Sequence, residues 1–129
     1  MTKHIPKGFG SVTPYLTVKG ADTLMLFVKH AFDAEEIECH REGDQIVHAI
    51  VRIGTSVVEL SEATQKWPAT LAALHLYVPD CDATHAKALA AGATGLHAPM
   101  DQDYGERSSA VRDPAGNHWY IATHQPARS

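Results

Sequence analysis

Hydrophobic and polar residues alternate most clearly near the middle of the chain, over residues 46–53 and 56–60. Both runs are rich in β-branched residues, and only a Gly-Thr pair at 54–55 separates them. A two-residue break of this kind is typical of a β-hairpin, with the break forming the turn. Counting back from that turn, the pattern predicts that Ile50 faces Glu59 across the hairpin.

An acid and an imidazole fall on one face of this predicted hairpin. Side chains alternate between the faces of a strand, so the register places His48 on the same face as Glu59. Solvent exposure would explain two polar residues on an outward face. Ile50 and Val57 share that face, however, and charged groups are seldom placed among apolar neighbours without a partner or a ligand. We therefore expect a lined cavity here, with Glu59 and His48 as its candidate catalytic pair, a base and its partner.

One order of elements, a strand, a helix and three strands, occurs in each half of the chain. Two such units can bury a joint core that neither could bury alone. The expected fold class is α+β: two tandem βαβββ modules forming a curved, half-open mixed sheet around a cleft, with the helices outside. The expected elements are a strand at 11–18, a helix at 22–32, a strand at 35–41, the hairpin, a strand at 74–78, a helix at 80–91, a strand near 94–97, a loop at 98–105 and a hairpin at 107–123.

The whole chain is expected to form one domain, with module 1 at about 10–62, a linker at 63–71 and module 2 at about 72–124. Within the first helix, the apolar residues recur at the spacing of one buried face. Asp33 follows this helix where a left-handed residue often ends one. Asp113 begins a Pro- and Gly-containing turn, and Trp119 is expected to lie in the core beneath a helix.

Composition narrows the classes of function. The chain has 129 residues, of which 44% are hydrophobic and 20% charged, as in ordinary soluble domains. No apolar run is long enough for a membrane span, and the start lacks a signal-peptide core, so a cytoplasmic location is expected. A net charge of −4 argues against nucleic acid as the partner. Cys39 and Cys81 are too few for a disulfide framework. Nine histidines invite a metal hypothesis, although no helical His-x-x-x-His spacing occurs.

Seven short motifs, taken in order and spacing, resemble the vicinal oxygen chelate superfamily. This superfamily is also called the glyoxalase / bleomycin-resistance / extradiol dioxygenase superfamily, and the likeness is greatest to its phosphonate-cluster-like glyoxalase branch. It covers about residues 10–124 and implies paired βαβββ modules, a small-molecule ligand and commonly a homodimer in which modules of two chains meet. The motifs are TPYLTV at 13–18, AFDA at 31–34, HAIVRIG at 48–54, LHLYV at 74–78, AGA at 91–93, YGER at 104–107 and DPAGNHW at 113–119.

The resemblance also implies metal-ligand positions, one on the first and one on the last strand of each module. Carried onto this sequence, they fall on Thr13, Glu59, Ala73 and Tyr120. A divalent metal needs three or four donors such as His, Glu or Asp, and only Glu59 is a good donor among the four. The usual metal site is therefore expected to be degraded, and no cofactor is expected.

A rearranged metal site stays open on strand parity. His48 shares the face of Glu59, and His75 lies two residues beyond Ala73, on the same face. Parity is weak evidence because half of all strand positions share a face, and a lone histidine on a strand is more often hydrogen-bonded structure than a ligand. A divalent metal held by Glu59, His48 and His75 is thus the alternative to a metal-free cleft.

The YGER motif carries a second candidate group. Arg107 could clamp an anionic or carbonyl oxygen, and Tyr104 could form a wall of the cleft. The alternative is a surface Arg107 that pairs with Asp101, Asp103 or Glu106. The candidate ligand-binding residues are Thr13, Tyr15, His75, Tyr77, Tyr104, Arg107 and Tyr120.

Two functions follow. The first is a small-molecule-binding protein of the glyoxalase/bleomycin-resistance type. The alternative is a metal-dependent lyase, transferase or dioxygenase that uses a rearranged site around Glu59. The missing metal ligands favour a protein that only binds its ligand, whereas the retained Glu59 favours catalysis. The sequence therefore leaves open whether the chain is an enzyme.

Overall fold

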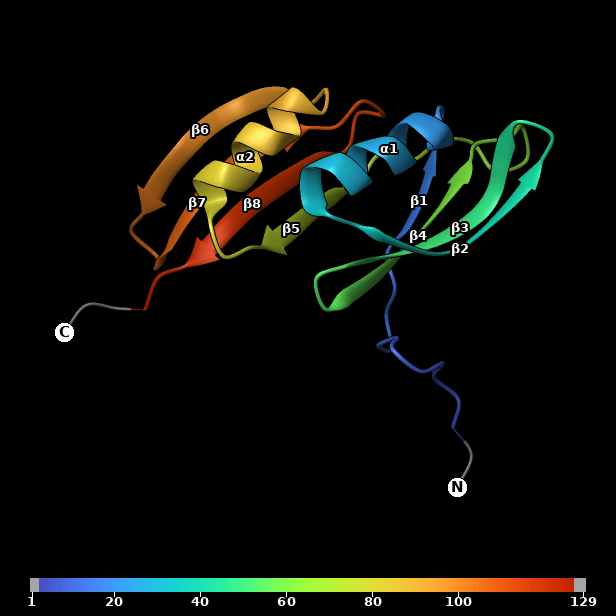
Figure 1. The fold of residues 1–129 in the computed structure, drawn as a ribbon, viewed down its shortest axis with the longest axis horizontal. Helices are drawn as coiled ribbons and strands as arrows, with labels where there is room; N and C mark the ends of the chain where they lie inside the picture. The colour runs from blue at the N-terminus through green and yellow to red at the C-terminus, as the bar shows by residue number, and fades with distance from the viewer. Residues whose placement is uncertain (1–2, 127–129) are drawn as a thin grey trace.

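The structure is a computed structural model, and it describes residues 3–126. Within these residues, eight strands form two four-stranded sheets, with the strand orders β1-β4-β3-β2 and β5-β8-β7-β6. Both helices lie on one side of the sheets (Figure 1), so the predicted α+β fold of two βαβββ units is confirmed. In chain order the elements are β1 (Tyr15–Val18), α1 (Ala21–Phe32), β2 (Glu35–Glu42), β3 (Gln45–Ile53), β4 (Ser56–Glu62), β5 (Ala73–Tyr77), α2 (Cys81–Ala90), β6 (Thr94–Gln102), β7 (Glu106–Arg112) and β8 (His118–His124).

The two sheets have the same internal arrangement. In each, the first strand pairs in parallel with the last strand of its half, and the other pairs are antiparallel. Tyr15 faces Glu59 in the first sheet, and His75 faces Tyr120 in the second. The first strands, β1 and β5, are both edge strands, and residues of both line one cavity. The face of each sheet that carries no helix is called the open face below.

The predicted hairpin is present in the predicted register. Ile53 faces Ser56 next to the turn, and Ile50 faces Glu59 three pairs further along. Gly54 has a φ of 58°, which an ordinary side chain rarely adopts and glycine adopts freely. The turn chemistry and the alternation of the strands therefore agree on one register.

The two helices bury different numbers of residues against the core. Helix α1 buries seven of its twelve residues and ends at Asp33, whose φ of 55° is the predicted left-handed conformation. Helix α2 buries only Cys81, His85 and Ala88, and Asp80 caps its first turn by accepting a hydrogen bond from a backbone N–H. No helix within residues 3–126 is long and apolar enough to cross a membrane.

One core joins the two halves. Trp119 from β8 is 2% exposed, and its ring lies 4.7 Å from the ring of Phe32 at the end of α1. Leu16 and Leu60 of the first sheet and Ile121 of the second belong to the same buried cluster. The halves thus bury apolar surface against each other, as a duplicated unit of this size requires.

The structure corrects two expected boundaries. The loop expected at 98–105 is wrong in its first part, because β6 continues to Gln102. Pro99 lies within this strand and lacks an N–H, but β6 is the outer strand of its sheet, where a missing donor is tolerated, and its register shifts around this point. The first strand is shorter than expected and starts at Tyr15, directly after Pro14.

Candidate functional site

The open face of the first sheet holds the predicted acid–imidazole pair. His48 Nε2 lies 2.6 Å from Glu59 Oε1, and both side chains are partly buried. Tyr15, which faces Glu59 across the parallel β1–β4 pair, stacks on His48 with ring centroids 5.9 Å apart. Hydrogen bonding restrains both partners, so the pair presents a fixed carboxylate and a fixed ring on this face.

A second acid–imidazole pair, not predicted from the sequence, extends this face. His40 Nε2 lies 2.7 Å from Glu38 on β2, and the His40 ring is nearly parallel to that of His48, at 6.3 Å. His40 and His48 face each other in the β2–β3 register. The spacing of Glu38 and His40, two residues apart on an expected strand, was the signal that placed them on one face. The result is a row of two imidazoles and two carboxylates across three strands.

The open face of the second sheet carries a different cluster. His75 contacts two tyrosine rings, Tyr77 at 4.7 Å and Tyr120 at 6.4 Å between centroids. The His75 Nε2 atom lies 3.3 Å from Oε2 of Glu106, the first residue of β7. Three of the predicted ligand-binding residues, His75, Tyr77 and Tyr120, are therefore neighbours.

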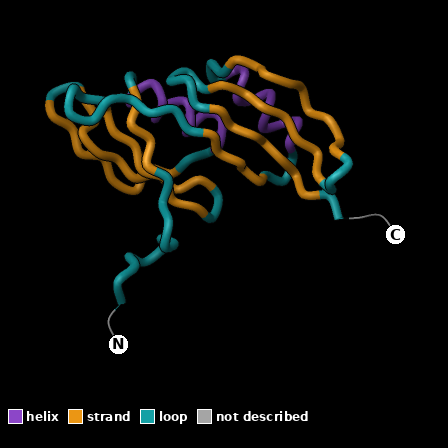
Figure 2. The backbone as a smooth tube through the Cα atoms, turned by 180° about the vertical axis from the view of Figure 1, so that it is seen from behind, coloured by secondary structure: helices purple, strands orange, loops and turns teal. Residues whose placement is uncertain are grey.

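Two cavities adjoin these clusters. One, of about 350 Å³, lies between β1 and β5 and is lined by Tyr15 from one sheet and His75 from the other, with Trp119 also in its lining. The second, of about 600 Å³, is lined by Glu59 and Thr13 together with residues of the N-terminal segment. That segment leaves the body on the side opposite the helices, as both views show (Figure 2).

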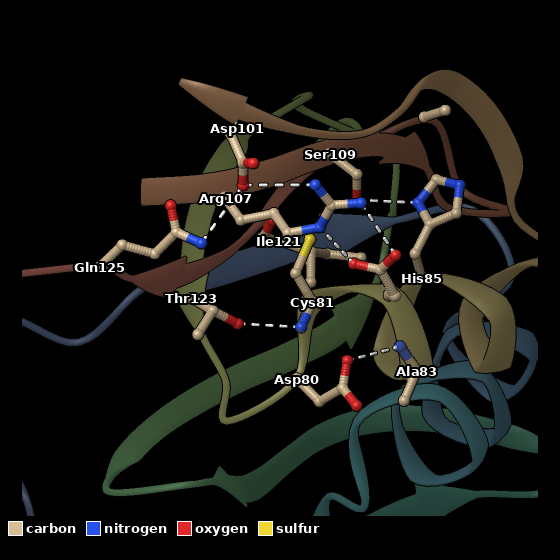
Figure 3. A network of polar contacts seen from close by, with 12 residues as sticks. Asp80, Cys81, Ala83, His85, Asp101, Arg107, Ser109, Ile121, Thr123 and Gln125 are labelled. Atoms are coloured by element: carbon tan, nitrogen blue, oxygen red, sulfur yellow. Dashed lines mark hydrogen bonds and ion pairs between the residues drawn. The ribbon is translucent and has the colours of Figure 1, made fainter. Parts of the chain in front are cut away.

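Arg107 lies on the opposite face of its sheet, under helix α2 (Figure 3). Its Nε and Nη2 atoms donate to the two carboxylate oxygens of Asp82, at 2.6 and 3.0 Å, and Nη1 donates to Asp101 at 3.3 Å. These bonds raise the pKa of Arg107 and lower the pKa of Asp82. The structure thus does not bring Arg107 to His75 and Tyr120, and its charge is already matched. Tyr104 is exposed in the turn before β7.

The polar groups beneath α2 form a structural network (Figure 3). His85 Nδ1 lies 2.8 Å from Ser109 Oγ, and Cys81 donates from Sγ to the Ile121 carbonyl oxygen at 3.2 Å. Burial raises the pKa of the Cys81 thiol and lowers the pKa of His85. A thiol held neutral in this way is a poor nucleophile, so the network anchors α2 to the sheet.

The donor set does not match a four-ligand metal site. Within residues 3–126, no three His, Cys, Asp or Glu side chains lie close enough to hold one ion together. Glu59 and His48 lie on the first sheet, whereas His75 lies on the second and bonds to Glu106. Among the positions implied by the resemblance, Ala73 has no donor group, and Thr13 and Tyr120 are poor ones.

Comparisons with known proteins agree with this fold. The sequence model described as "Glyoxalase/Bleomycin resistance protein/Dioxygenase superfamily" matches residues 8–121. An uncharacterised protein of Mycobacterium bovis is 35% identical over 130 residues, covering 92% of this chain and 84% of the relative. Among solved structures, TioX from Micromonospora sp. ML1 superposes with a TM-score of 0.75 at 20% identity, covering 93% of this chain and all of that one. A glyoxalase/bleomycin resistance protein/dioxygenase family enzyme from Burkholderia phytofirmans PsJN superposes with a TM-score of 0.72 at 20% identity. The match covers 87% of this chain and 96% of that one.

Proposed function

Because the chain belongs to the glyoxalase/bleomycin resistance protein/dioxygenase superfamily, we propose that it binds a small oxygenated molecule around the Glu59–His48 pair. The ligand would lie against the open faces, where Thr13, Tyr15 and His75 line the two cavities. Tyr77 and Tyr120 lie beside the His75 ring. Arg107 has no direct part in this proposal, since its three hydrogen bonds bind it to acids on the other face.

One observation carries the proposal. The Glu59 carboxylate is hydrogen-bonded to an imidazole at 2.6 Å beside a cavity of about 600 Å³ that Ile50 also lines. A solvent-facing pair on a strand needs no such cavity, and pockets of this size with a few convergent polar groups are the usual form of small-molecule sites. Glu59 supplies acceptors, and His48 supplies a ring that can donate or accept.

Metal-dependent catalysis as a lyase, transferase or dioxygenase is the second candidate, favoured by the same Glu59. It needs at least two further donors at the Glu59 carboxylate, and the nearest imidazole, His48, already uses Nε2 to bond that carboxylate. We therefore propose ligand binding without a metal ahead of lyase, transferase or dioxygenase activity. Membership of the phosphonate-cluster-like branch stays a prediction.

A homodimer is part of the proposal. Large apolar side chains remain exposed, among them Trp67 at 66%, which lines a groove on the open face of the first sheet with Tyr15 and Thr17. Tyr77 is likewise exposed on the second sheet. Exposed aromatic side chains next to a binding face are typical of surfaces that associate with another protein. A second copy would cover these rings and narrow both cavities.

A titration of ¹⁵N-labelled protein tests the binding site. The probes are metal-free bleomycin and the hemithioacetal of methylglyoxal and glutathione, representing two ligand types of this superfamily. We expect at least one to shift backbone signals of Tyr15 and His48, with a dissociation constant raised at least tenfold by Glu59→Gln. Glu42→Gln, an exposed acid on β2, is the matched control and should leave the constant unchanged. Binding that Glu59→Gln does not weaken, or no binding of either probe, would contradict the proposed site.

A further inference from the structure

Glu106 is a buried acid on the open face of the second sheet. Only 6% of the residue is exposed, although it is the first residue of β7 and follows a turn. Its register partners are Gln102 on β6 and His124 on β8. Glutamate is rarely buried to this extent unless it is paired, because the charged form loses its hydration.

The pairing of this carboxylate is sparse. Within residues 3–126, His75 provides its one side-chain hydrogen bond, at 3.3 Å. The neighbouring positions of this face on β7 and β8 hold small residues: Ser108, Ala110 and Ala122 are all nearly inaccessible. A buried carboxylate that served only the fold would be expected to collect several donors, as Asp113 does with four. Glu106 instead has the single imidazole of His75 as its side-chain partner among the described residues.

The backbone around Glu106 holds it in place. Gly105 has a φ of 88° and accepts a hydrogen bond from the Gln125 N–H, which fixes the turn into β7. The next residue, Arg107, is tied to Asp82 on helix α2 by two hydrogen bonds. Because adjacent strand residues point to opposite faces, this anchor on the helix side aims Glu106 at the open face. Arg107 therefore orients the strand, and Glu106 is the residue of the YGER motif that contacts His75 on the open face.

We infer that Glu106 is the positioning residue of His75. A carboxylate only accepts hydrogen bonds, so His75 Nε2 carries the proton that it shares with Glu106, and Nδ1 is left unprotonated in the neutral ring. An acid behind an imidazole fixes both the tautomer and the ring orientation in this way. His75 also lines the cavity between β1 and β5. Its Nδ1 is then an acceptor for a ligand that offers a hydroxyl or amide N–H group.

The use of Nδ1 by a ligand rests on the proposed binding function, whereas the Glu106–His75 arrangement can be tested without any ligand. The test is ¹H–¹⁵N NMR of the His75 ring in the full chain and in three variants. Glu106→Gln keeps a carbonyl acceptor, and Glu106→Leu removes the acceptor with little change in volume. Glu38→Leu, which removes the acid of the exposed Glu38–His40 pair, is the matched control.

We expect the wild-type ring to show Nε2 protonated and Nδ1 unprotonated, with a slowly exchanging Nε2–H signal. That signal should persist in Glu106→Gln and in the control, and should be lost in Glu106→Leu. The midpoint of thermal unfolding should not fall in Glu106→Leu, because an apolar side chain replaces a buried charge and the freed His75, 40% exposed, can bond to water.

A ring protonated at Nδ1 would overturn the inference, as would a Nε2–H signal that survives in Glu106→Leu. A Glu106→Leu variant that unfolds at lower temperature, or fails to fold, would assign Glu106 to the fold and overturn it too. Failure of both probes to bind, with the His75 signature intact, would contradict the proposed function and leave the Glu106–His75 assignment standing.

Discussion

Replacement of Asp113 by asparagine tests whether the DPAGN turn is structural. Asp113 is 3% exposed and accepts four hydrogen bonds. Its Oδ1 accepts from the backbone N–H groups of Ala115 and Asn117. Its Oδ2 accepts from Asn117 Nδ2 at 3.1 Å and from Trp119 Nε1 at 2.8 Å. The carboxylate thus ties the turn to the largest buried side chain of the core.

The expected loss follows from these contacts. Asp113→Asn keeps the volume and the Oδ1 acceptor, but it places an NH₂ group opposite two N–H donors. Asn117 and Trp119 are both nearly inaccessible, so water cannot replace the lost acceptor. Each buried donor left without a partner costs about 1–3 kcal/mol, which sums to roughly 2–4 kcal/mol of unfolding free energy after partial relaxation.

Urea denaturation followed by circular dichroism measures this loss. Asp103→Asn is the control, because Asp103 is exposed in the turn between β6 and β7, and its replacement should change the free energy by less than about 0.5 kcal/mol. An Asp113→Asn variant that is as stable as the control would refute the structural role of the turn.

Three further predictions concern the helix network, the β7 turn and the acid pair. Burial lowers the pKa of His85 below its ordinary 6.5, so the unfolded chain binds a proton more readily. Stability should therefore fall as the pH decreases below about 6.5; urea midpoints at pH 7.5 and 5.5 would show this, and His85→Gln should reduce the difference. Gly105→Ala forces an alanine to a φ of 88° with its Cβ 3.3 Å from the Gln125 oxygen, and should cost about 1–3 kcal/mol in denaturation, against little change for Gly10→Ala. Glu59→Ala should cost about 1 kcal/mol or less, because water can reach His48; a much larger loss by calorimetry would make the pair structural.

Local patterns were enough to predict the first half of the site. The hairpin register depends only on the turn at 54–55 and on the alternation of its strands, so the facing of Ile50 and Glu59 and the shared face of His48 followed from the sequence. Trp119 was placed in the core for the same reason, since its neighbours alternate around it.

Long-range packing decides what the sequence could not show. Arg107 and Glu106 are adjacent, and which of them lies on the open face depends on where α2 lies, because Asp82 of that helix binds the arginine. The partner of His75 comes from β7, 31 residues along the chain. The extent of β6 past Pro99 likewise depends on its position at the edge of the sheet.

Elemental analysis of the protein, purified without a polyhistidine tag, tests the central claim most directly. It would be followed by reconstitution with nickel, zinc, manganese and iron and by a thermal-shift readout, with Glu59→Ala alongside the wild type. Ligand binding without a metal predicts no stoichiometric metal and no stabilisation by any of the four ions. About one metal per subunit, lost in Glu59→Ala, would contradict it and would make metal-dependent catalysis around Glu59 the better description.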